Sequence, residues 1–417
     1  MHLTTDHFRN LKMAPPDSIL SVDQAYKEDR NSEKMDFGVA AYRNEKGGPH
    51  VFKVVRKALD EVLADPEHDF EYLPIEGLTG FCEESRKFAF GADDPFVKEG
   101  KIATVQTPGG TGALRVGFDF LKLFMKGDVY ISDPTWETHK SIVEKAGLKH
   151  VEYPYLKKGT FDFDFDSMYN TFSQAPHGSI IILHQCAHNP TGVDPTMDQW
   201  KKLAKLVKEK GLFPFFDSAL HGWASGSLQK DREPMEIFLK EGLQLMVAQS
   251  FSKTLGLYGE RVGALHVVCS DHDTVERVLS QLKLIVRPMY SNAPAIGGRI
   301  AWKVLENPQY VKQWQEEFEL MFKRVRKMRQ ELYDEIQEIG IKGNWDHLVK
   351  QTGMFFYTGL SKKQCQVLTE KHHAYVTESG RMTVSGLNEG NLKRFARALK
   401  DVVDNYGDDS ENTTNDI

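Results

Sequence analysis

Residues 250–261 read Ser-Phe-Ser-Lys-Thr-Leu-Gly-Leu-Tyr-Gly-Glu-Arg and directly follow an apolar run at 245–249 that predicts a buried strand. Lys253 is therefore expected at the carboxyl end of a strand, where an amine can leave solvent and lose basicity, as Schiff-base formation requires. Ser250 and Arg261 supply a hydroxyl and a guanidinium that suit a phosphate dianion. The stretch indicates an aldehyde cofactor carrying a phosphate, and pyridoxal phosphate fits; the alternative is a solvated surface loop.

A second strand pattern, at 212–216, ends in a single carboxylate, Asp217. A buried aspartate beside the ring nitrogen of pyridoxal phosphate keeps that nitrogen protonated, and only then does the ring accept electrons. The alternative is that Asp217 caps the turn that follows, as many strand-end aspartates do.

The phosphate needs a cradle, and the Gly-rich turn at 109–112 offers one before a helix predicted at 113–125. Adjacent glycines allow a tight turn, and free N–H groups at a helix start attract an anion. Gly110 and Thr111 are the candidate contacts. The turn lacks the third glycine and the ribose-binding acid of the dinucleotide fingerprint.

A fourth segment, His-Gln-Cys-Ala-His-Asn-Pro-Thr-Gly at 184–192, follows a strand predicted at 179–183. Asn189 precedes a proline, which holds its backbone extended and fixes its amide at the strand end, where it could donate to a ring oxygen. The rival interpretation is a metal site made by His184, Cys186 and His188, but the sequence shows no fourth ligand.

These segments, in this order, resemble the fold-type I pyridoxal phosphate-dependent aminotransferases, and specifically the aspartate aminotransferase family. The likeness extends from residues 14–17 to 380–387 and includes motifs at 71–75, 133–137 and 286–292. It implies an α/β fold in which a large domain has a mostly parallel sheet covered by helices on both faces, beside a smaller α/β domain.

The resemblance also implies roles for individual residues. Lys253 would form the Schiff base and move a proton between substrate and cofactor, Asp217 would hold the ring nitrogen, and Asn189 the ring's phenolic oxygen. Trp136 would stack on the ring, with a core aromatic as the alternative. The cofactor's phosphate would be held by Gly110, Thr111, Ser250 and Arg261, with Tyr72 reaching over from a second subunit.

Two arginines would decide the substrate. By resemblance, Arg381 binds the α-carboxylate, and Arg287 reaches over from the partner of a homodimer to bind a side-chain carboxylate. Two guanidinium forks at opposite ends of a site select dicarboxylic amino and 2-oxo acids. The expected reaction is ping-pong amino transfer from L-aspartate to 2-oxoglutarate, giving oxaloacetate and L-glutamate. Alternatives are an aromatic or dicarboxylic amino acid transaminase and a weakly active relative that binds the cofactor.

Two positions depart from the family pattern. Leu220 stands where the family has a tyrosine whose hydroxyl bonds the cofactor's phenolic oxygen, and leucine has no donor. One lost buried hydrogen bond costs about 1–3 kcal/mol, or roughly ten- to a hundredfold in rate if it acts on the transition state. Ala40 replaces a glycine whose backbone meets the substrate, and its methyl group could crowd that contact.

Alternating strand and helix patterns predict the domain layout. Beyond the strands already named, strands are expected at 103–107, 129–133 and 262–268, with helices at 196–210 and 308–339; strands at 355–360 and 375–384 and a helix at 391–406 follow. We predict an N-terminal arm at 1–14, a small domain at 15–49 and 321–408, a large domain at 50–320 and a disordered acidic tail at 409–417.

Composition narrows the class of protein. The 417 residues have a net charge of −6, with 27% charged and 40% hydrophobic residues, which is an ordinary balance for a soluble protein. No basic cluster suggests nucleic acid, and no apolar run approaches the roughly 20 residues of a membrane span. The four scattered cysteines and the N-terminus, which has neither signal-peptide nor transit-peptide character, predict a cytoplasmic protein with reduced thiols.

Overall fold

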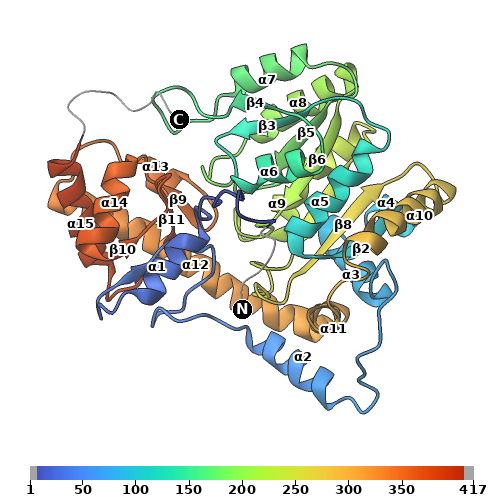
Figure 1. The fold of residues 1–417 in the computed structure, drawn as a ribbon, viewed down its shortest axis with the longest axis horizontal. Coiled ribbons are helices and arrows are strands. Elements are labelled where there is room, and N and C mark those ends of the chain that lie inside the picture. The colour runs from blue at the N-terminus through green and yellow to red at the C-terminus, as the bar shows by residue number, and fades with distance from the viewer. Residues whose placement is uncertain (1–6, 408–417) are drawn as a thin grey trace.

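The structure is a computed structural model and describes residues 7–407. A seven-stranded sheet forms its centre (Figure 1), and all its strands are parallel to their neighbours except β8, which is antiparallel to both β2 and β7. In spatial order the strands are β2 (Ile102–Pro108), β8 (Val262–Val268), β7 (Met246–Ser250), β6 (Phe213–Ser218), β5 (Ile180–His184), β3 (Val129–Asp133) and β4 (His150–Pro154). The expected mostly parallel sheet is confirmed.

Helices cover both faces of this sheet because its central strands are apolar on both sides. Successive side chains point to opposite faces, so Phe215 packs in one cluster and Phe216 in the other. One face is covered by α5 (Gly109–Lys122), α6 (Thr138–Lys145) and α10 (His272–Met289). The other face is covered by α7 (Phe165–Gln174), α8 (Met197–Lys210) and α9 (Leu228–Lys240).

Sequence patterns missed two features of this region. The helix expected at 113–125 begins earlier, as α5 at Gly109, so the Gly-rich turn forms its first turn. The edge strand β4 was not predicted, because its sequence His-Val-Glu-Tyr-Pro is half exposed and lacks a continuous apolar run. The predicted helix at 196–210 is confirmed as α8, whose capping box joins Thr196 and Gln199.

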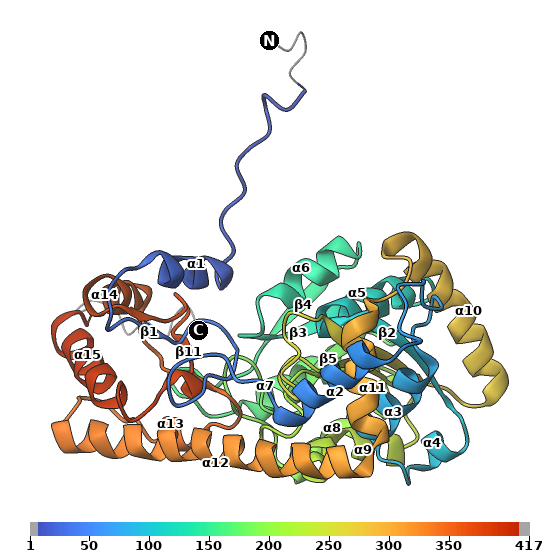
Figure 2. The same cartoon turned by 90° about the horizontal axis from the view of Figure 1, so that it is seen from below.

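A long helix, α12 (Pro308–Ile339), confirms the prediction at 308–339 and runs from α11 to α15 (Figure 2). Asn307 caps its N-terminus, because its side chain accepts from the N–H of Gln309. Gly340, with φ +66°, caps its C-terminus. Its buried apolar positions recur every three or four residues, from Tyr310 to Ile336, and form one stripe.

Segments from the start and the end of the chain together form smaller elements around two two-stranded sheets. One pairs β1 (Met35–Asp36) with β10 (Ala374–Tyr375), and the other pairs β9 (Phe355–Tyr357) with β11 (Arg381–Thr383). The helices here are α1 (Leu20–Glu28), α13 (His347–Lys350), α14 (Lys362–His372) and α15 (Leu392–Asn405), with a 3-10 turn at Val384–Gly386.

The single strand expected at 375–384 is wrong. A turn separates β10 from β11, closed by the Gly380 N–H donating to the Thr377 carbonyl at 3.0 Å. Gly380 has φ +79°, which a continuous strand does not allow. The strand expected at 355–360 is shorter, since β9 ends at Tyr357, whereas the helix expected at 391–406 is confirmed as α15.

The remaining helices lie along the chain between β1 and β2 and after α10. They are α2 (Lys53–Ala64), α3 (Thr79–Phe90), α4 (Pro95–Lys98) and α11 (Ala295–Glu306). The chain before α1 projects away from the body in Figure 2, while residues 1–6 and the acidic tail expected at 409–417 lie outside the described residues. The domain boundaries predicted above remain a prediction. Among the described helices, none has both the length and the apolar character needed to cross a membrane.

Candidate active site

Three predicted site residues lie at or just beyond the ends of neighbouring strands. Asp217 is the last residue but one of β6, Lys253 lies just beyond β7, and Asn189 lies just beyond β5. The register pairs His184 with Asp217 across β5 and β6. Because carboxyl ends of parallel strands meet at one edge of a sheet, these side chains gather there, where ligands of open α/β sheets bind.

Lys253 is partly buried, in a turn between Ser252 and Thr254. Burial is the largest effect on its ammonium group. Together with the positive charges of Arg381 and Arg261 it outweighs the attraction of Asp217 and lowers the pKa of Lys253 to about 8. With this pKa, about a tenth of the amine is uncharged at pH 7, which is the form that a nucleophile requires.

Asp217 is buried, and its Oδ2 accepts a hydrogen bond from His139 Nε2 at 2.8 Å. Burial alone would raise the pKa of this carboxyl. The His139 hydrogen bond and the attraction of His139, His184 and Lys253 reverse that effect and hold the pKa below its ordinary value. The site thus contains an anion shielded from water, and the turn-capping interpretation does not describe it.

A chain of hydrogen bonds behind Asp217 was not foreseen from the sequence. The Asn189 N–H donates to His184 Nδ1 at 3.1 Å, so the proton of this ring is on Nε2, 3.2 Å from the Thr135 hydroxyl. Thr135 in turn lies 2.8 Å from His139 Nδ1 and can donate to it, which leaves His139 Nε2 to donate to Asp217. The only sequence signal for His139 was its place three residues after Trp136.

His184, Cys186 and His188 do not converge as a metal site would require. The His184 and His188 rings lie 4.1 Å apart between centroids, and His188 stacks on Tyr155 at 3.7 Å. Cys186 Sγ instead lies 3.5 Å from Asp231 Oδ2 and 3.4 Å from the Leu220 carbonyl. Within residues 7–407, no group of three or more histidine, cysteine or acidic side chains is arranged to hold a metal ion.

The Gly-rich turn meets Ser250 and Arg261 closely. A Cβ on Gly110 would lie 2.9 Å from Ser250 Cβ, and one on Gly109 would lie 2.6 Å from Arg261 Nη2. Gly109 also has φ +74°, so both the space and the backbone favour glycine. Arg261 Nη1 lies 3.5 Å from the hydroxyl of Ser252, a neighbour of Lys253 that sequence reasoning did not choose.

Thr111 and Trp136 lie at the edges of this region. Thr111 is exposed in the first turn of α5. Trp136 is partly buried and meets His139 edge to face, with centroids 5.2 Å apart. Trp136, Asn189 and Arg381 line one cavity of about 190 Å³, which brings an aromatic face, an amide and a guanidinium together.

Arg381 is buried at the start of β11, and no carboxylate within residues 7–407 is hydrogen-bonded to it. Its Nη2 donates to the Gly38 carbonyl at 3.1 Å and its Nη1 to Asn189 Oδ1 at 3.4 Å. Burial lowers the pKa of Arg381 to about 10, so the guanidinium stays charged at neutral pH. A buried cation that faces a cavity fits an anionic ligand.

The two residues that depart from the family pattern, Leu220 and Ala40, belong to or pack against the same apolar cluster. Leu220 is buried in an apolar cluster that also contains Ala187 and Trp223. Ala40 is partly buried in the loop after Gly38 and packs against the same cluster. The Nε2–H of His221, the neighbour of Leu220, donates to the Leu228 carbonyl at 2.8 Å. This nitrogen is therefore not free to replace a tyrosine hydroxyl.

Tyr72 and Arg287 are not brought into the site of their own chain. Tyr72 is 82% exposed, in the segment before α3. Arg287 is exposed in the last turn of α10, where its Nη1 donates to the Ser291 hydroxyl. Within residues 7–407, neither side chain makes a hydrogen bond or ion pair with Lys253, Asp217 or Arg381.

Comparison with known proteins agrees with this geometry. Residues 32–399 match a family model described as "Aminotransferase class I and II". The chain is 44% identical over 397 residues to "Aspartate aminotransferase, cytoplasmic" of Oryza sativa subsp. japonica, covering 95% of this chain and 98% of the relative. It is equally identical over 397 residues to "Aspartate aminotransferase 3, chloroplastic" of Arabidopsis thaliana, covering 95% and 88%.

Two solved structures have the same fold. The aspartate aminotransferase from the cytoplasm of Saccharomyces cerevisiae superposes with a TM-score of 0.93 at 38% identity, covering 96% of this chain and 99% of that one. An aromatic-amino-acid aminotransferase from Burkholderia pseudomallei, covalently bound to pyridoxal phosphate, superposes with a TM-score of 0.91 at 38% identity, covering 96% and 100%.

Proposed function

The chain belongs to the class I and II aminotransferase family, and we propose that within it the chain is a pyridoxal phosphate-dependent aspartate aminotransferase. It transfers the amino group of L-aspartate to 2-oxoglutarate and yields oxaloacetate and L-glutamate. The observation that carries the proposal is Lys253, an amine with a pKa lowered to about 8 that interacts electrostatically with Asp217, Arg261 and Arg381. An amine and an acid at one sheet edge, with two cations that interact with the amine, match the groups that such a transfer needs.

The residues present fit pyridoxal phosphate. Arg261 and Ser250 flank glycines whose missing Cβ atoms leave a cradle for the phosphate. The pKa of Asp217, which the His139 hydrogen bond helps to hold below its ordinary value against the effect of burial, suits a carboxylate that faces a protonated ring nitrogen. We propose Lys253, Asp217, Asn189, Trp136, Gly110, Thr111, Ser250 and Arg261 as the residues of one chain that hold the cofactor.

The bound cofactor supplies an electron sink for the substrate's Cα. Lys253 Nζ would move the proton between substrate and cofactor. Its lowered pKa allows it to take a proton from Cα, and because it is already close by, no base has to diffuse in from solvent. Asp217 would hold the ring nitrogen of the bound cofactor and keep it protonated. Asn189, whose Oδ1 already accepts from Arg381, can use its amide N–H groups on a ring oxygen.

We propose that Arg381 binds the α-carboxylate of each substrate. It is buried, charged and lines the cavity beside Trp136. The side-chain carboxylate needs a second cation, and we assign this role to Arg287 of a neighbouring copy. Tyr72 would reach the cofactor's phosphate from the same copy. A homodimer with shared sites explains why these two residues are exposed in the single chain.

Three further proposals follow from the sequence. The segments 15–49 and 321–408 form a small domain beside a large domain at 50–320. The Ala40 backbone meets the substrate.

The protein is cytoplasmic, since its four cysteines are all free and buried. Fractionation of cells that express the tagged protein would test the last proposal, which an organellar location would overturn.

A coupled assay tests the activity. Cofactor-loaded protein is given L-aspartate and 2-oxoglutarate, and oxaloacetate is measured by its enzymatic reduction. Turnover with double-reciprocal lines that stay parallel as the second substrate varies is the expected result, because one site serves both substrates in turn. Cofactor-loaded protein without aspartate turnover would contradict the proposal.

A second candidate is an aromatic amino acid transaminase, because a structure of that activity superposes closely on this chain. The same assay with phenylalanine as donor separates the two. We expect kcat/KM for aspartate to exceed that for phenylalanine, since Arg287 offers a charge to the side-chain carboxylate that phenylalanine does not use.

A further inference from the structure

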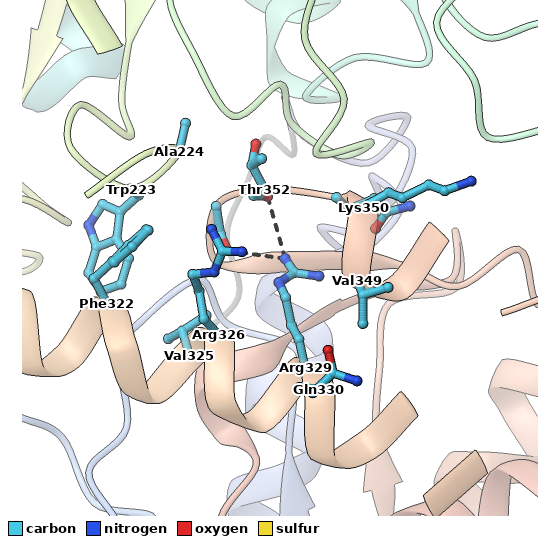
Figure 3. A pocket seen from close by; sticks show the side chains of 12 residues that line it. Trp223, Ala224, Phe322, Val325, Arg326, Arg329, Gln330, Val349, Lys350 and Thr352 are labelled. Carbon is cyan, nitrogen blue, oxygen red and sulfur yellow. Dashed lines mark hydrogen bonds between the residues drawn. The ribbon is translucent and has the colours of Figure 1, made fainter. Parts of the chain in front are cut away.

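A second cavity, of about 100 Å³, is lined by a separate set of residues that does not include those proposed for catalysis. Figure 3 shows that its walls come from three places: Trp223 and Ala224 in the loop after β6, Arg326 and Arg329 on α12, and Thr352 after α13. Cationic, aromatic and apolar side chains line it. Among its described lining residues, none is acidic.

Arg329 is the buried cation of this cavity, with 4% of its surface exposed. Its guanidinium donates to main-chain carbonyls only, including those of Leu348 at 3.0 Å and Gly353 at 3.1 Å. Carbonyl dipoles satisfy the N–H groups but do not cancel the charge. Buried charges ordinarily have a partner of opposite sign, and within residues 7–407 no carboxylate pairs with Arg329.

Arg326 adds a second positive charge one helical turn away. Burial, and after it the charge of Arg326, lowers the pKa of Arg329 to about 9. Both guanidiniums rise from α12 toward the same space in Figure 3. Lys350 places a third cation on the rim, extending away from the pair. In the described part of the chain, neither Arg326 nor Lys350 makes an ion pair, although the protein carries a net charge of −6.

We propose that this cavity binds a small oxyanion, of which inorganic phosphate is the simplest. An anion there would offset the repulsion between two like charges at i and i+3 and would accept from the guanidinium of Arg326. The volume of about 100 Å³ is sufficient for one such ion and too small for a nucleotide.

The cavity walls connect this ion to the candidate active site. The indole Nε1 of Trp223 donates to the main-chain carbonyl of Lys253 at 3.3 Å. The Thr352 N–H donates to the Gly192 carbonyl at 2.7 Å, three residues after Asn189. An anion that orders these walls therefore also orders the turn of Lys253 and the loop of Asn189. By linkage, occupation of one site changes the affinity of the other.

Calorimetric titration of the cofactor-loaded protein with inorganic phosphate tests the proposal. Arg326→Glu should weaken saturable binding by about tenfold or more, because it puts a negative charge beside the ion. Lys312→Glu is the matched control: it makes the same change in charge at an exposed position of the same helix, outside this cavity, and should bind as the unchanged protein does. Arg381→Ala removes the cation of the other site and should also leave this binding intact.

Hydrogen exchange supplies a second measurement. Phosphate should slow exchange at 220–224 and 349–353 in the unchanged protein and in Lys312→Glu, but not in Arg326→Glu. Loss of binding in Arg381→Ala alone would place the ion at the substrate arginine and overturn the proposal. Equal binding by Arg326→Glu and Lys312→Glu, or no saturable binding in the unchanged protein, would overturn it as well.

Discussion

The candidate site has two ends that differ in how the chain builds them. At the interior end, Lys253, Asp217 and Arg381 are held by burial, hydrogen bonds and neighbouring charges of their own chain. At the surface end, Tyr72 is 82% exposed, and Arg287 is exposed and donates to the Ser291 hydroxyl. On the proposed assignment, one chain prepares the cofactor chemistry, whereas recognition of the second carboxylate depends on another copy.

This difference has a physical reason. An amine with a lowered pKa and a carboxylate shielded from water need a fixed, low-dielectric surrounding, which a sheet edge under packed helices provides. Arg287, proposed for the side-chain carboxylate, is by contrast exposed in the single chain, whereas Arg381, proposed for the α-carboxylate, is buried. On this proposal, substrate selection depends on assembly of two copies.

The largest effect should come from the interior end. Lys253→Ala removes both the covalent attachment of the cofactor and the group that moves the proton, so turnover should fall by about 10⁴-fold or more. Borohydride reduction followed by peptide mass mapping should label Lys253 in the unchanged protein. Lys205→Ala, at an exposed position of α8, is the control and should keep both label and turnover. A label on another lysine would refute the assignment.

The second prediction tests the surface end of the site. Arg287→Ala should lower kcat/KM for aspartate by about 10²-fold, since a charge-assisted pair at the substrate is lost. Co-expression of Arg287→Ala with Lys253→Ala should restore about one quarter of the unchanged activity: half of randomly formed dimers are mixed, and each mixed dimer has one complete site of two. No restoration would mean that Arg287 serves its own chain or none.

The sequence predicted the interior end better than the rest. The apolar runs predicted the strands correctly, and the polar residues lie at or soon after their ends: Asp217 is the last residue but one of β6, and Lys253 and Asn189 lie in the segments after β7 and β5. His139 and Ser252 were missed, since neither is marked by a pattern and each matters only through a contact across the fold.

The surface end of the site and the turn between β10 and β11 were harder to predict from the sequence. Nothing in the residues around Tyr72 or Arg287 states that they serve a neighbour, and this expectation came from resemblance alone. The turn between β10 and β11 did carry a sequence signal: residues 376–380 read Val-Thr-Glu-Ser-Gly, and Ser-Gly is a turn dipeptide. The strand prediction missed it because apolar residues on both sides of the turn are buried and extend the strand-like pattern.

The third prediction concerns the position of Leu220. Leu220→Tyr should raise kcat/KM about tenfold if its hydroxyl reaches the cofactor's phenolic oxygen, because one buried hydrogen bond contributes about 1–3 kcal/mol. The pH midpoint of the cofactor's visible absorbance should fall, since the added donor stabilises the phenolate. Overpacking of this buried position will reduce stability. Leu220→Phe adds the ring without the hydroxyl and should change neither readout; an equal effect of both variants would count against the hydroxyl.

The smallest effect concerns the scaffold that holds Asn189. Asp194 accepts from the main-chain N–H groups of Ala187 and His188 at 2.7 and 2.9 Å, and Ala187 has φ +50°, an uncommon conformation for a residue with a side chain. Burial is the main effect that raises the pKa of Asp194 to about 6 from the ordinary 3.8. The folded chain therefore keeps this proton between roughly pH 4 and 6, where the unfolded chain has lost it.

The contribution of Asp194 to the free energy of unfolding should accordingly be greatest below pH 4 and should be lost as the pH rises through 6. Between pH 5 and 7.5, the unchanged protein should lose about 1.4 kcal/mol relative to Asp194→Asn, whose amide does not titrate. Denaturant unfolding at both pH values measures the difference, and Asp198→Asn, which alters an exposed carboxylate nearby, should show none. If the unfolding free energies of the unchanged protein and Asp194→Asn differ by the same amount at both pH values, the pKa of Asp194 is not raised. The backbone N–H groups, which favour the ionised carboxylate, would then outweigh the effect of burial.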